Sequence, residues 1–328
     1  MAKKNLLPLL VTIGDPNGIG PEIAVSLWKM KHSVKRPIAL VGDFQVVLSA
    51  LALKGISKEA VLIETPEEAK KACELGMIPV LSCGVNFKGK IRPEKICKEA
   101  GKASIAWVRE ATKLCLEKRA AAVVTAPLCK ESVEKTVPGF QGHTEFIGEM
   151  CGDSRPVLCL VHKDWVVAHV STHVSLREAC DRAKKERILK TATLLNDFLI
   201  RYKKVKTPCL GIAGLNPHAG EGGLFGTEEI EEIIPAIREL KKKKIKAEGP
   251  FPGDVIFPKL RSGAFDGVVA MYHDQGLAPF KLLAMEDGVN YTAGLPIVRT
   301  SPDHGTAYDI AGKGKASPSS FLQAIYAA

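Results

Sequence analysis

Short apolar runs alternate with longer stretches of helical periodicity along most of this chain. The runs have the length of buried strands, and the stretches between them place apolar residues on one helical face. The predicted strands are residues 9–13, 37–42, 60–64, 78–82, 121–125 and 208–213. The predicted helices are residues 21–30, 45–54, 101–118, 145–150, 176–202, 228–244 and 318–328. This alternation predicts an α/β protein with largely parallel sheets.

Two neighbouring runs depart from the alternation. Residues 156–161 and 165–170 are separated by a short polar turn at Lys163 and Asp164, with no helical stretch between them. They predict an antiparallel hairpin. Farther along, Ser175 is placed to cap the predicted helix 176–202, just as Thr144 is placed to cap the helix that starts at residue 145.

Length and composition are those of a globular chain. The 328 residues allow one large or two ordinary domains, and 46% of them are hydrophobic and 25% charged. No apolar run is long enough to span a bilayer. Residues 6–13 follow two lysines and so faintly resemble a signal peptide. They lead into Gly14-Asp15-Pro16 rather than a small-residue cleavage site, and we interpret them as the first strand.

Net charge and cysteine content indicate which classes of binding partner and which cellular compartment to expect. A formal charge of +10 is compatible with an anionic substrate, a nucleic acid or a membrane surface. The densest basic run, residues 241–244, ends a predicted helix, where lysines complement the helix dipole, and no aromatic residues interleave with it. We therefore expect no nucleic-acid or membrane partner. The nine cysteines form no CxxC pair, and several lie in apolar runs, which is typical of reduced thiols in a cytoplasmic protein.

Three histidines lie where ligands bind in α/β proteins, after the carboxyl ends of apolar runs. His218 lies in a glycine-rich loop, residues 214–226, between a predicted strand and a predicted helix. His173 and His273 each follow another strand-like run. Imidazole is a common ligand of zinc-type ions, so the three could share one metal. Each histidine alone is equally compatible with a loop or capping role, because the spacing is too long for a local chelate.

Weaker signals occur elsewhere. Residues 14–20 form a glycine loop before a predicted helix and resemble a phosphate cradle, although the spacing matches neither common phosphate-loop motif. His143 lies beside a predicted helix start, where an anion is favoured. Asp254 lies in a rigid Gly-Pro loop and is interpreted as a turn former with a possible role. Three further residues have side chains suited to phosphate or carboxylate groups but are each equally compatible with a surface role: Lys281, Asn290 and Arg299.

The chain resembles the 4-hydroxythreonine-4-phosphate dehydrogenase family of vitamin B6 biosynthesis over its whole length. The resemblance rests on long, specific blocks rather than on single residues. They are GDPNGIGPEI, GHTEF, STHVSL, GLNPHAGEGGLFGTEE, GPFPGD, AMYHDQGLAPFK, GVNYTAGLP and VRTSPDHGTAYDIAGKG.

This resemblance implies an NAD(P)-dependent oxidation of 4-phosphooxy-L-threonine to a 3-oxo acid. The oxo acid would lose CO2 to give 3-amino-2-oxopropyl phosphate, on the route to pyridoxal 5′-phosphate. It implies a divalent metal (zinc, magnesium or cobalt) held by His173, His218 and His273, in a site shared across a homodimer. The general base stays unassigned, and Asp274, beside His273, is a candidate for supporting the metal ligands. The implied substrate contacts are His143, Thr144, Lys281, Asn290 and Arg299.

The carboxyl-terminal HGTA segment also resembles isopropylmalate and isocitrate dehydrogenases. This implies two α/β/α lobes with a cleft between them, the first made of residues 1–135 and 291–328 and carrying the cofactor segment. The second, residues 136–290, would carry the metal site and the dimer interface. The implied cofactor contacts are His304, Gly305, Thr306 and Asp309. A carboxylate at Asp309 would accept a ribose hydroxyl and repel a 2′-phosphate, so we expect NAD, with NADP kept open by the lysines that follow.

Three other functions compete with this reading. Relatives that oxidise 4-phospho-D-threonate or 4-phospho-D-erythronate share the chemistry, and no motif here separates them. A metal-dependent phosphohydrolase would use similar residues but would not need the HGTA segment. A non-catalytic phosphate-binding protein would not need the histidine ligands.

Overall fold

The computed structural model describes residues 6–30, 33–93, 95–152, 156–163, 165–284 and 287–328. The chain divides into two compact units, and we describe each by itself. The first is Met1–Arg155 with Leu295–Ala328, and the second is Pro156–Gly294. The sequence-based expectation placed the boundaries after residues 135 and 290. The unit boundary lies later in the chain because helix α6 (His143–Met150) packs on helix α4 (Lys98–Leu116) of the first unit.

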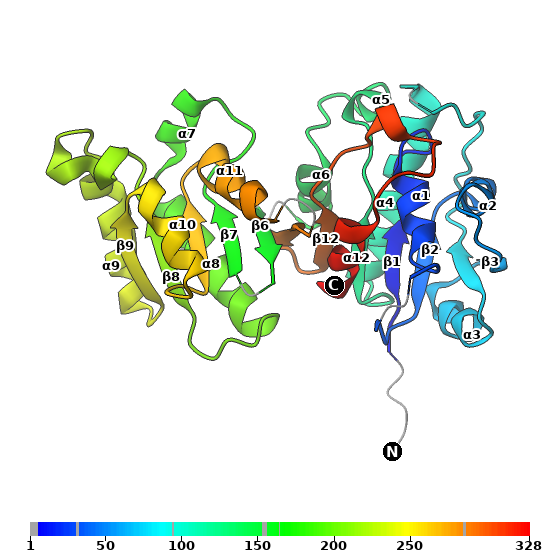
Figure 1. Cartoon of the computed structure of the whole chain (residues 1–328), viewed down its shortest axis with the longest axis horizontal. Coiled ribbons are helices and arrows are strands. Elements are labelled where there is room, and N and C mark those ends of the chain that lie inside the picture. The colour runs from blue at the N-terminus through cyan, green and yellow to red at the C-terminus, as the bar shows by residue number, and fades with distance from the viewer. Residues whose placement is uncertain (1–5, 31–32, 94, 153–155, 164, 285–286) are drawn as a thin grey trace, which may run out of the picture. The chain divides into compact units, whose positions relative to one another are not determined.

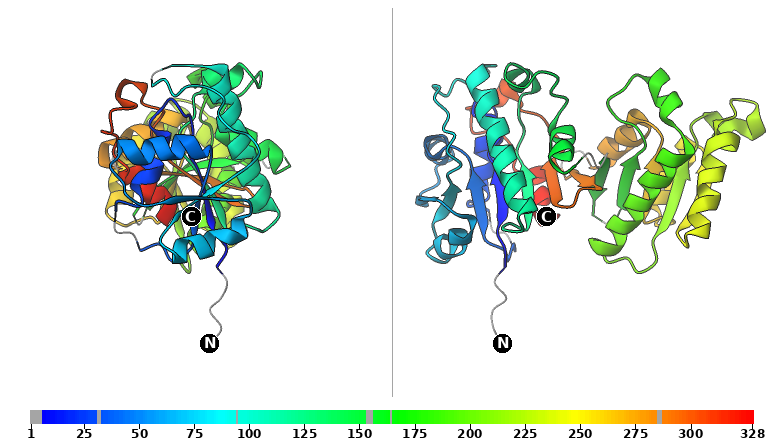
Figure 2. Two further views of the ribbon diagram at one scale, coloured as in Figure 1. Left: turned by 90° about the vertical axis from the view of Figure 1, so that its right-hand side faces the viewer. Right: turned by 180° about the vertical axis from the view of Figure 1, so that it is seen from behind.

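The first unit is built on a parallel sheet whose strands follow the order β3-β4-β2-β1-β5-β12. The strands are β1 (Leu9–Thr12), β2 (Ile38–Val41), β3 (Ala60–Ile63), β4 (Ile78–Leu81), β5 (Ala122–Thr125) and β12 (Val298–Pro302). Helices α1 (Gly20–Ser26) and α12 (Ser319–Tyr326) cover one face, and α4 covers the other (Figures 1 and 2). The remaining helical segments are α2 (Phe44–Leu53), η1 (Pro66–Glu68), α3 (Ala69–Glu74), α5 (Lys130–Glu134) and η4 (Tyr308–Ile310).

The second unit contains a mixed sheet in the order β11-β6-β7-β10-β8-β9. The pairs β11–β6 and β6–β7 are antiparallel, and the pairs from β7 onward are parallel. The strands are β6 (Val157–His162), β7 (Trp165–His169), β8 (Cys209–Ala213), β9 (Lys246–Phe251), β10 (Gly267–Ala270) and β11 (Val289–Ala293). Its helical segments are α7 (Leu176–Arg182), α8 (Lys185–Arg201), η2 (Pro217–Gly223), η3 (Glu229–Ile233), α9 (Ile234–Lys242), α10 (Gly253–Arg261) and α11 (His273–Ala284).

Helices cover both faces of this second sheet as well. Helices α10 and α11 pack on one face and α8 on the other, with α9 beside α8 (Figures 1 and 2). The apolar core between the sheet and α10 and α11 includes Val167, Val268 and the fully buried Phe280. Each unit is therefore an α/β/α layer structure, which confirms the predicted fold class. None of the described helices combines the length and the apolar character that crossing a bilayer requires.

Most predicted elements are present, including the antiparallel hairpin of β6 and β7. The single helix predicted over residues 176–202 is wrong, because the chain leaves helical geometry at Ala183 (ψ 56°) and starts again at Lys185. The Lys185 amide donates to Glu232 Oε2 at 2.8 Å, which caps the second helix. Ser175 caps the first helix as predicted, since its hydroxyl accepts the Glu178 amide at 3.2 Å.

Two further predictions are corrected. Thr144 does not cap α6, because the helix begins at His143, two residues earlier than predicted, and Gly142 occupies the N-cap position. The helix predicted over residues 228–244 begins as a wide π-helical turn and becomes α-helical at Ile234. Pro235 has no amide hydrogen to donate to the preceding turn, which explains the irregular start.

Candidate active site

Two of the three predicted metal ligands lie together in the second unit. Strands β7 and β10 are parallel neighbours, and the chain after each stays paired: the Val170 amide donates to Ala270 O at 2.9 Å, and Ser171 Oγ donates to Met271 O at 3.0 Å. This pairing brings the His173 and His273 rings to a centroid distance of 5.8 Å. Both line a cavity of about 490 Å³ together with Tyr272.

The His273 ring is oriented by its neighbour in sequence. His273 Nδ1 donates to Asp274 Oδ1 at 2.6 Å, while the Asp274 side chain is 84% exposed. A carboxylate on one ring nitrogen fixes the tautomer and leaves the other nitrogen, Nε2, as a metal-binding lone pair. The pair of imidazoles with this carboxylate therefore suits a zinc-type ion chemically.

The glycine-rich loop that carries His218 has an unusual backbone. Five consecutive residues, from His218 to Gly222, have left-handed φ values between 44° and 81°. Three of them are not glycine, and each such residue costs on the order of 1 kcal/mol relative to a right-handed one. Such a run persists only if the surrounding structure over-determines it.

The Glu229 side chain holds much of this loop in place. It is 2% exposed, and its Oε1 accepts the Leu215 amide at 2.7 Å and the Asn216 amide at 2.8 Å. Asn216 Nδ2 donates to Glu229 Oε2 at 2.9 Å and to Glu228 Oε2 at 2.7 Å. A Cβ at Gly220 would lie 2.7 Å from Glu229 Oε2, so this position must be glycine for the loop to fold around the carboxylate.

Gln275 connects this loop to the strand end that precedes His273. Its Nε2 donates to Gly214 O at 2.7 Å, and its Oε1 accepts the Met271 amide at 2.7 Å. His218 lines a second cavity, of about 510 Å³, to which Tyr272, Gln275 and Asp254 also contribute. Asp254 lies in the first turn of α10 rather than in the loop that we expected.

The described part of the chain does not bring all three histidines into one metal-binding geometry. No group of three His, Cys, Asp or Glu side chains among the described residues is arranged to hold a metal ion. His173 and His273 form a pair, and His218 lies against the separate cavity described above. Within one chain, the structure thus supplies two of the three ligands that the sequence pattern predicted.

A fourth histidine, which sequence reasoning did not single out, lies behind this pair. His169 is 2% exposed, and its Nδ1 donates to Leu158 O at 3.3 Å, while its Nε2 has no hydrogen-bond partner among the described residues. Burial, with a smaller effect from His273 and His173, lowers its pKa to about 4. A Cβ at Gly276 would lie 2.2 Å from this nitrogen, so only glycine lets α11 pass the ring.

In the first unit, a buried arginine forms the centre of a cationic site. Arg299 is 4% exposed; its Nη2 donates to Thr125 Oγ1 at 2.8 Å and its Nη1 to Thr144 Oγ1 at 3.4 Å. Burial lowers its pKa to about 10, with Glu145 opposing the shift, so the guanidinium stays charged at neutral pH.

His143 lies next to this guanidinium. Burial, then the positive charges of Arg299 and Lys130, lower the His143 pKa well below its usual value, so the ring is neutral at neutral pH. Its Nε2 is buried without a hydrogen-bond partner among the described residues. Our sequence analysis did not single out Lys130. It follows the predicted strand 121–125, and the same argument from position after a strand that selected the histidines could have selected it.

The five predicted substrate residues are divided between the two units. His143, Thr144 and Arg299 belong to the first unit, and Lys281 and Asn290 belong to the second. Lys281 is exposed in the last turn of α11, and Asn290 is a partly buried residue of β11.

The predicted cofactor segment rests on the first glycine motif of the chain. Tyr308 Oη donates to Asp15 Oδ2 at 2.9 Å, the Ile19 amide donates to Thr306 O at 3.0 Å, and the Gly312 amide donates to Glu22 Oε1 at 2.5 Å. Burial raises the pKa of Asp15 despite these bonds, and burial also raises the pKa of Tyr308. The segment that carries the predicted contacts is thus pinned at several points.

This packing corrects the interpretation of residues 14–20 as a phosphate cradle. The loop is buried, and a Cβ at Gly18 would lie 3.1 Å from Thr306. The glycines let the loop lie close to the protein's own backbone, and the cavity that Pro16, Asn17 and Gly18 line has a volume of only about 60 Å³. In the predicted cofactor segment that packs on this loop, Asp309 is exposed. His304 Nε2 is buried without a hydrogen-bond partner among the described residues.

Comparison with known proteins decides the family. The model of the pyridoxal phosphate biosynthetic protein PdxA family matches residues 33–328. The chain belongs to the PdxA family. Among PdxA relatives, the 4-hydroxythreonine-4-phosphate dehydrogenase of Bacteroides thetaiotaomicron is 39% identical over 328 residues, covering 99% of this chain and 89% of the relative.

A second PdxA relative carries a different substrate name. The D-threonate 4-phosphate dehydrogenase of Pectobacterium atrosepticum is 37% identical over 318 residues, covering 97% of each protein. Among solved structures, the 4-hydroxythreonine-4-phosphate dehydrogenase of Klebsiella pneumoniae has a TM-score of 0.86 and 38% identity, covering 98% of each chain. These proteins are dehydrogenases, which confirms the predicted enzyme class for the family.

Proposed function

We propose that this chain is an NAD(P)-dependent dehydrogenase that oxidises 4-phosphooxy-L-threonine in pyridoxal 5′-phosphate biosynthesis. The product would be a 3-oxo acid that decarboxylates to 3-amino-2-oxopropyl phosphate. The observation that carries the proposal is the full-length similarity to enzymes named for this reaction, at 39% identity over 328 residues. The side chains that the reaction needs, described above, support it.

The residues of the first unit would bind the anionic substrate. Arg299 is held in place by two threonine hydroxyls, and its charge lies beside the neutral His143. A phosphate or carboxylate bound here would gain charge-assisted hydrogen bonds from a guanidinium that needs no further reorganisation. Because burial keeps His143 neutral, its buried Nε2 can accept or donate a single hydrogen bond without adding charge.

The histidines of the second unit would hold the divalent metal. His173, His273 and His218 are the proposed ligands, with Asp274 fixing the His273 ring. A bound metal would supply Lewis-acid chemistry at the substrate hydroxyl and at the resulting ketone, and bound NAD would supply the hydride acceptor. Glu229 and Gln275 would hold the His218 loop in position while the substrate is bound.

The cofactor contacts proposed are His304, Gly305, Thr306 and Asp309. Asp309 is exposed in a segment whose backbone is fixed by Asp15 and Glu22, so its carboxylate is available to a ribose hydroxyl. We propose NAD as the preferred cofactor, because a carboxylate at this point disfavours a 2′-phosphate.

The third metal ligand leads to a proposal about assembly. A homodimer in which His218 and the His173–His273 pair come from different chains would complete the set that one chain does not complete. Mixing inactive His218→Ala and His273→Ala proteins under subunit exchange would then restore about a quarter of wild-type activity, since half of the dimers would carry one intact site. No recovery, in mixtures shown to contain hybrid dimers, would place all three ligands in one chain. We also propose a cytoplasmic location, since all nine cysteines are free thiols.

A second candidate function differs from the first only in its substrate. Oxidation of D-threonate 4-phosphate, or of its erythronate analogue, is favoured by the 37% identity to the Pectobacterium enzyme. The test is reduced-nicotinamide formation by metal-replete protein with NAD and each of the three phosphorylated acids. Turnover with the amino acid alone supports the proposal, and turnover only with the sugar acids replaces it with the second candidate. If none is oxidised, the dehydrogenase assignment fails, and release of inorganic phosphate would then point to a hydrolase.

A further inference from the structure

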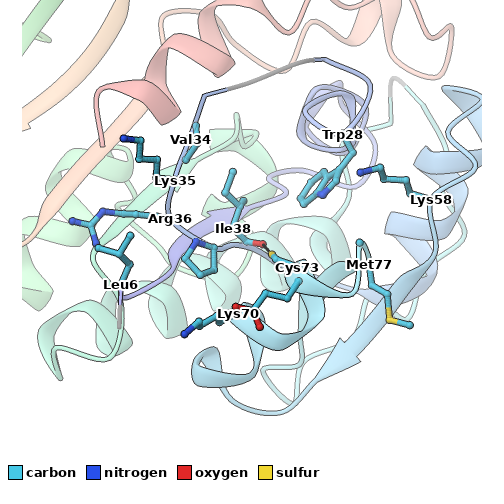
Figure 3. Close-up of a pocket in the computed structure, with 13 residues that line it drawn as sticks. Leu6, Trp28, Val34, Lys35, Arg36, Ile38, Lys58, Lys70, Cys73 and Met77 are labelled. Atoms are coloured by element: carbon cyan, nitrogen blue, oxygen red, sulfur yellow. Dashed lines mark hydrogen bonds between the residues drawn. The ribbon is translucent and has the colours of Figure 1, made fainter. Parts of the chain in front are cut away.

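The first unit contains a cavity at the amino-terminal edge of its own sheet, the edge opposite to the one that the cofactor segment contacts. It has a volume of about 600 Å³, which is within the range of small-molecule sites. Its lining includes Leu6, Pro37 and Met77, which immediately or closely precede strands β1, β2 and β4 (Figure 3). The cofactor segment instead contacts the chain that follows β1. Ligands for the reaction bind at carboxyl strand ends in such sheets, so this cavity is distinct from the proposed active site.

One wall of the cavity is aromatic and its floor is apolar. Trp28 follows the end of α1 and is only partly buried, and its indole is directed into the cavity (Figure 3). Ile38 is 4% exposed and Met77 is partly buried. A partly exposed indole beside aliphatic side chains is a surface on which a flat ring can stack.

The rim of the cavity is strongly basic. Of the lining residues that the structure describes, four carry a positive charge and one, Glu74, carries a carboxylate. The cations come from separate parts of the unit: Lys35, Arg36, Lys58 and Lys70. Figure 3 shows Lys58 on the same side as Trp28, and Arg36 with Leu6 on the other side. Arg36 Nη1 donates to Leu7 O at 3.4 Å, which limits its freedom.

The cavity has the composition of a binding site rather than of a reaction site. Among the described lining residues there is a single thiol, Cys73, whose Sγ donates to Ile38 O at 3.7 Å. Burial raises the pKa of this thiol, so it stays protonated at neutral pH and is a poor nucleophile. A ring-stacking wall with a cationic rim and no reactive group suits a ligand that combines a flat apolar ring with negative charge.

We propose that this cavity binds a small aromatic monophosphate, with its ring against Trp28 and its phosphate at the basic rim. A single ring with a phosphate fits the volume, and the excess of cations over carboxylates provides the charge complementarity. The proposal does not depend on the proposed function, because none of these residues belongs to the metal, substrate or cofactor sets.

The test is calorimetric titration of the full-length, metal-free protein with phenyl phosphate, without nicotinamide. Wild-type protein is compared with the double variant Arg36→Ala/Lys58→Ala and with Trp28→Leu. The matched control is Lys241→Ala/Lys242→Ala, which removes the same charge from an exposed helix end of the second unit. We expect affinity to fall about ten-fold or more in the double variant and several-fold in Trp28→Leu, and to be unchanged in the control. Thermal melts of all variants would show that each is folded.

Three results would overturn the proposal. Equal weakening in the control would mean that net charge, not this cavity, drives binding. Unchanged affinity in folded cavity variants would place the ligand elsewhere, including at Arg299. Displacement by inorganic phosphate as effective as by phenyl phosphate would reduce the site to an anion site without ring recognition. Because the assay involves no turnover, failure here is separate from failure of the dehydrogenase assignment, and the cavity variants are expected to keep wild-type turnover.

Discussion

Two glycine-rich segments carry most of the predicted chemistry, and both are anchored by buried carboxylates, but from different distances along the chain. Glu229 holds the His218 loop through amides only 14 and 13 residues away. Asp15 and Glu22 hold the cofactor segment across separations of 293 and 290 residues. The His218 loop is therefore organised by the helical segment that follows it, whereas the predicted cofactor segment requires the fold of the whole first unit.

The backbones of the two segments differ as well. The His218 loop contains a left-handed run with three non-glycine residues, while Ala307 is the one non-glycine residue with positive φ in the described segment 304–314. The strained loop needs several strong bonds to one buried side chain, and the relaxed segment needs only a few separate bonds. Loss of an anchoring carboxylate should therefore disturb the His218 loop more than the predicted cofactor segment.

The largest effect is expected from Glu229→Gln. Both oxygens of Glu229 accept hydrogen bonds, Oε1 from the Leu215 and Asn216 amides and Oε2 from Asn216 Nδ2. Whichever way the Gln amide turns, its NH2 faces a donor, so at least one buried group loses its partner. We expect zinc affinity to fall about 10- to 100-fold and unfolding free energy to fall by roughly 2 kcal/mol. Both are measured, by zinc titration of metal-free protein and by urea denaturation.

Glu231→Gln is the matched control, because it removes the same charge from an exposed neighbour. Zinc affinity that falls equally in both variants would show that negative charge near the loop, not the geometry imposed by Glu229, supports metal binding.

Acid is expected to have a similar effect on stability, measured in metal-free protein and so separate from the loss of zinc affinity that defines the Glu229 variant. The His169 pKa is lowered from 6.5 to about 4 in the folded state. The unfolded chain therefore binds more protons in this range, so the stabilising contribution is present above about pH 6.5 and is lost as pH falls toward 4. We expect this residue to account for a loss of about 2 kcal/mol between pH 7 and pH 5 in metal-free protein.

His143, neutral for the same reason in the first unit, shifts stability in the same direction. Urea denaturation of His169→Gln at both pH values tests the account, because the variant should lose less stability on acidification than wild type. An identical loss in the two proteins would mean that His169 is protonated without cost in the folded state.

Tyr308→Phe tests the anchor of the cofactor segment. It removes the bond to Asp15 Oδ2 while the backbone bonds of Thr306 and Gly312 remain. A hydrogen bond from a neutral hydroxyl to a carboxyl group contributes about 1 kcal/mol. We therefore expect the KM for NAD to rise about five-fold with little change in kcat. Steady-state kinetics would show this, with Tyr326→Phe, at an exposed tyrosine of α12, as the control. A lower kcat with unchanged KM would mean that Tyr308 acts in the chemistry instead.

The smallest effect is expected at Asp309, which is exposed and anchors nothing through its side chain among the bonds described. Asp309→Asn should lower the preference for NAD over NADP by roughly three-fold, since the negative charge that repels the 2′-phosphate is removed. The ratio of kcat/KM for the two cofactors measures it. A ratio equal to that of wild type would place the ribose elsewhere.

The parts of this fold that could be predicted depend on local patterns. The strands β1, β2 and β5 are continuous apolar runs, and Ser175 caps its helix through a residue three positions away. Helix α11 was missed because Gly276 and Pro279 are poor helix formers, and the first is required by the His169 ring. Strand β9 was missed because it has no apolar run: it contains Lys246 and Glu248, and Gly249 and Pro250 are poor strand formers.

The candidate site was predictable to a similar extent. The three histidines were singled out from their position after strands, and Arg299 and His143 from their residue type and position. The family resemblance then gave Arg299 and His143 a predicted role in substrate binding. Glu229 lay within a predicted helix, but its contacts depend on a left-handed backbone that no sequence period indicates. The bond between Asp15 and Tyr308 joins residues 293 positions apart, and only the folded first unit brings them together.

The most direct test of the account is metal-dependent turnover of a single protein sample. Reduced nicotinamide is followed with 4-phosphooxy-L-threonine and NAD in the protein as purified, after removal of metal by a chelator, and after zinc, cobalt or magnesium is restored. We predict turnover that is abolished by the chelator and recovered with at least one of the ions, and not recovered in His273→Ala. Undiminished turnover in demonstrably metal-free protein, or full turnover in His273→Ala, would contradict the proposed histidine-held metal site.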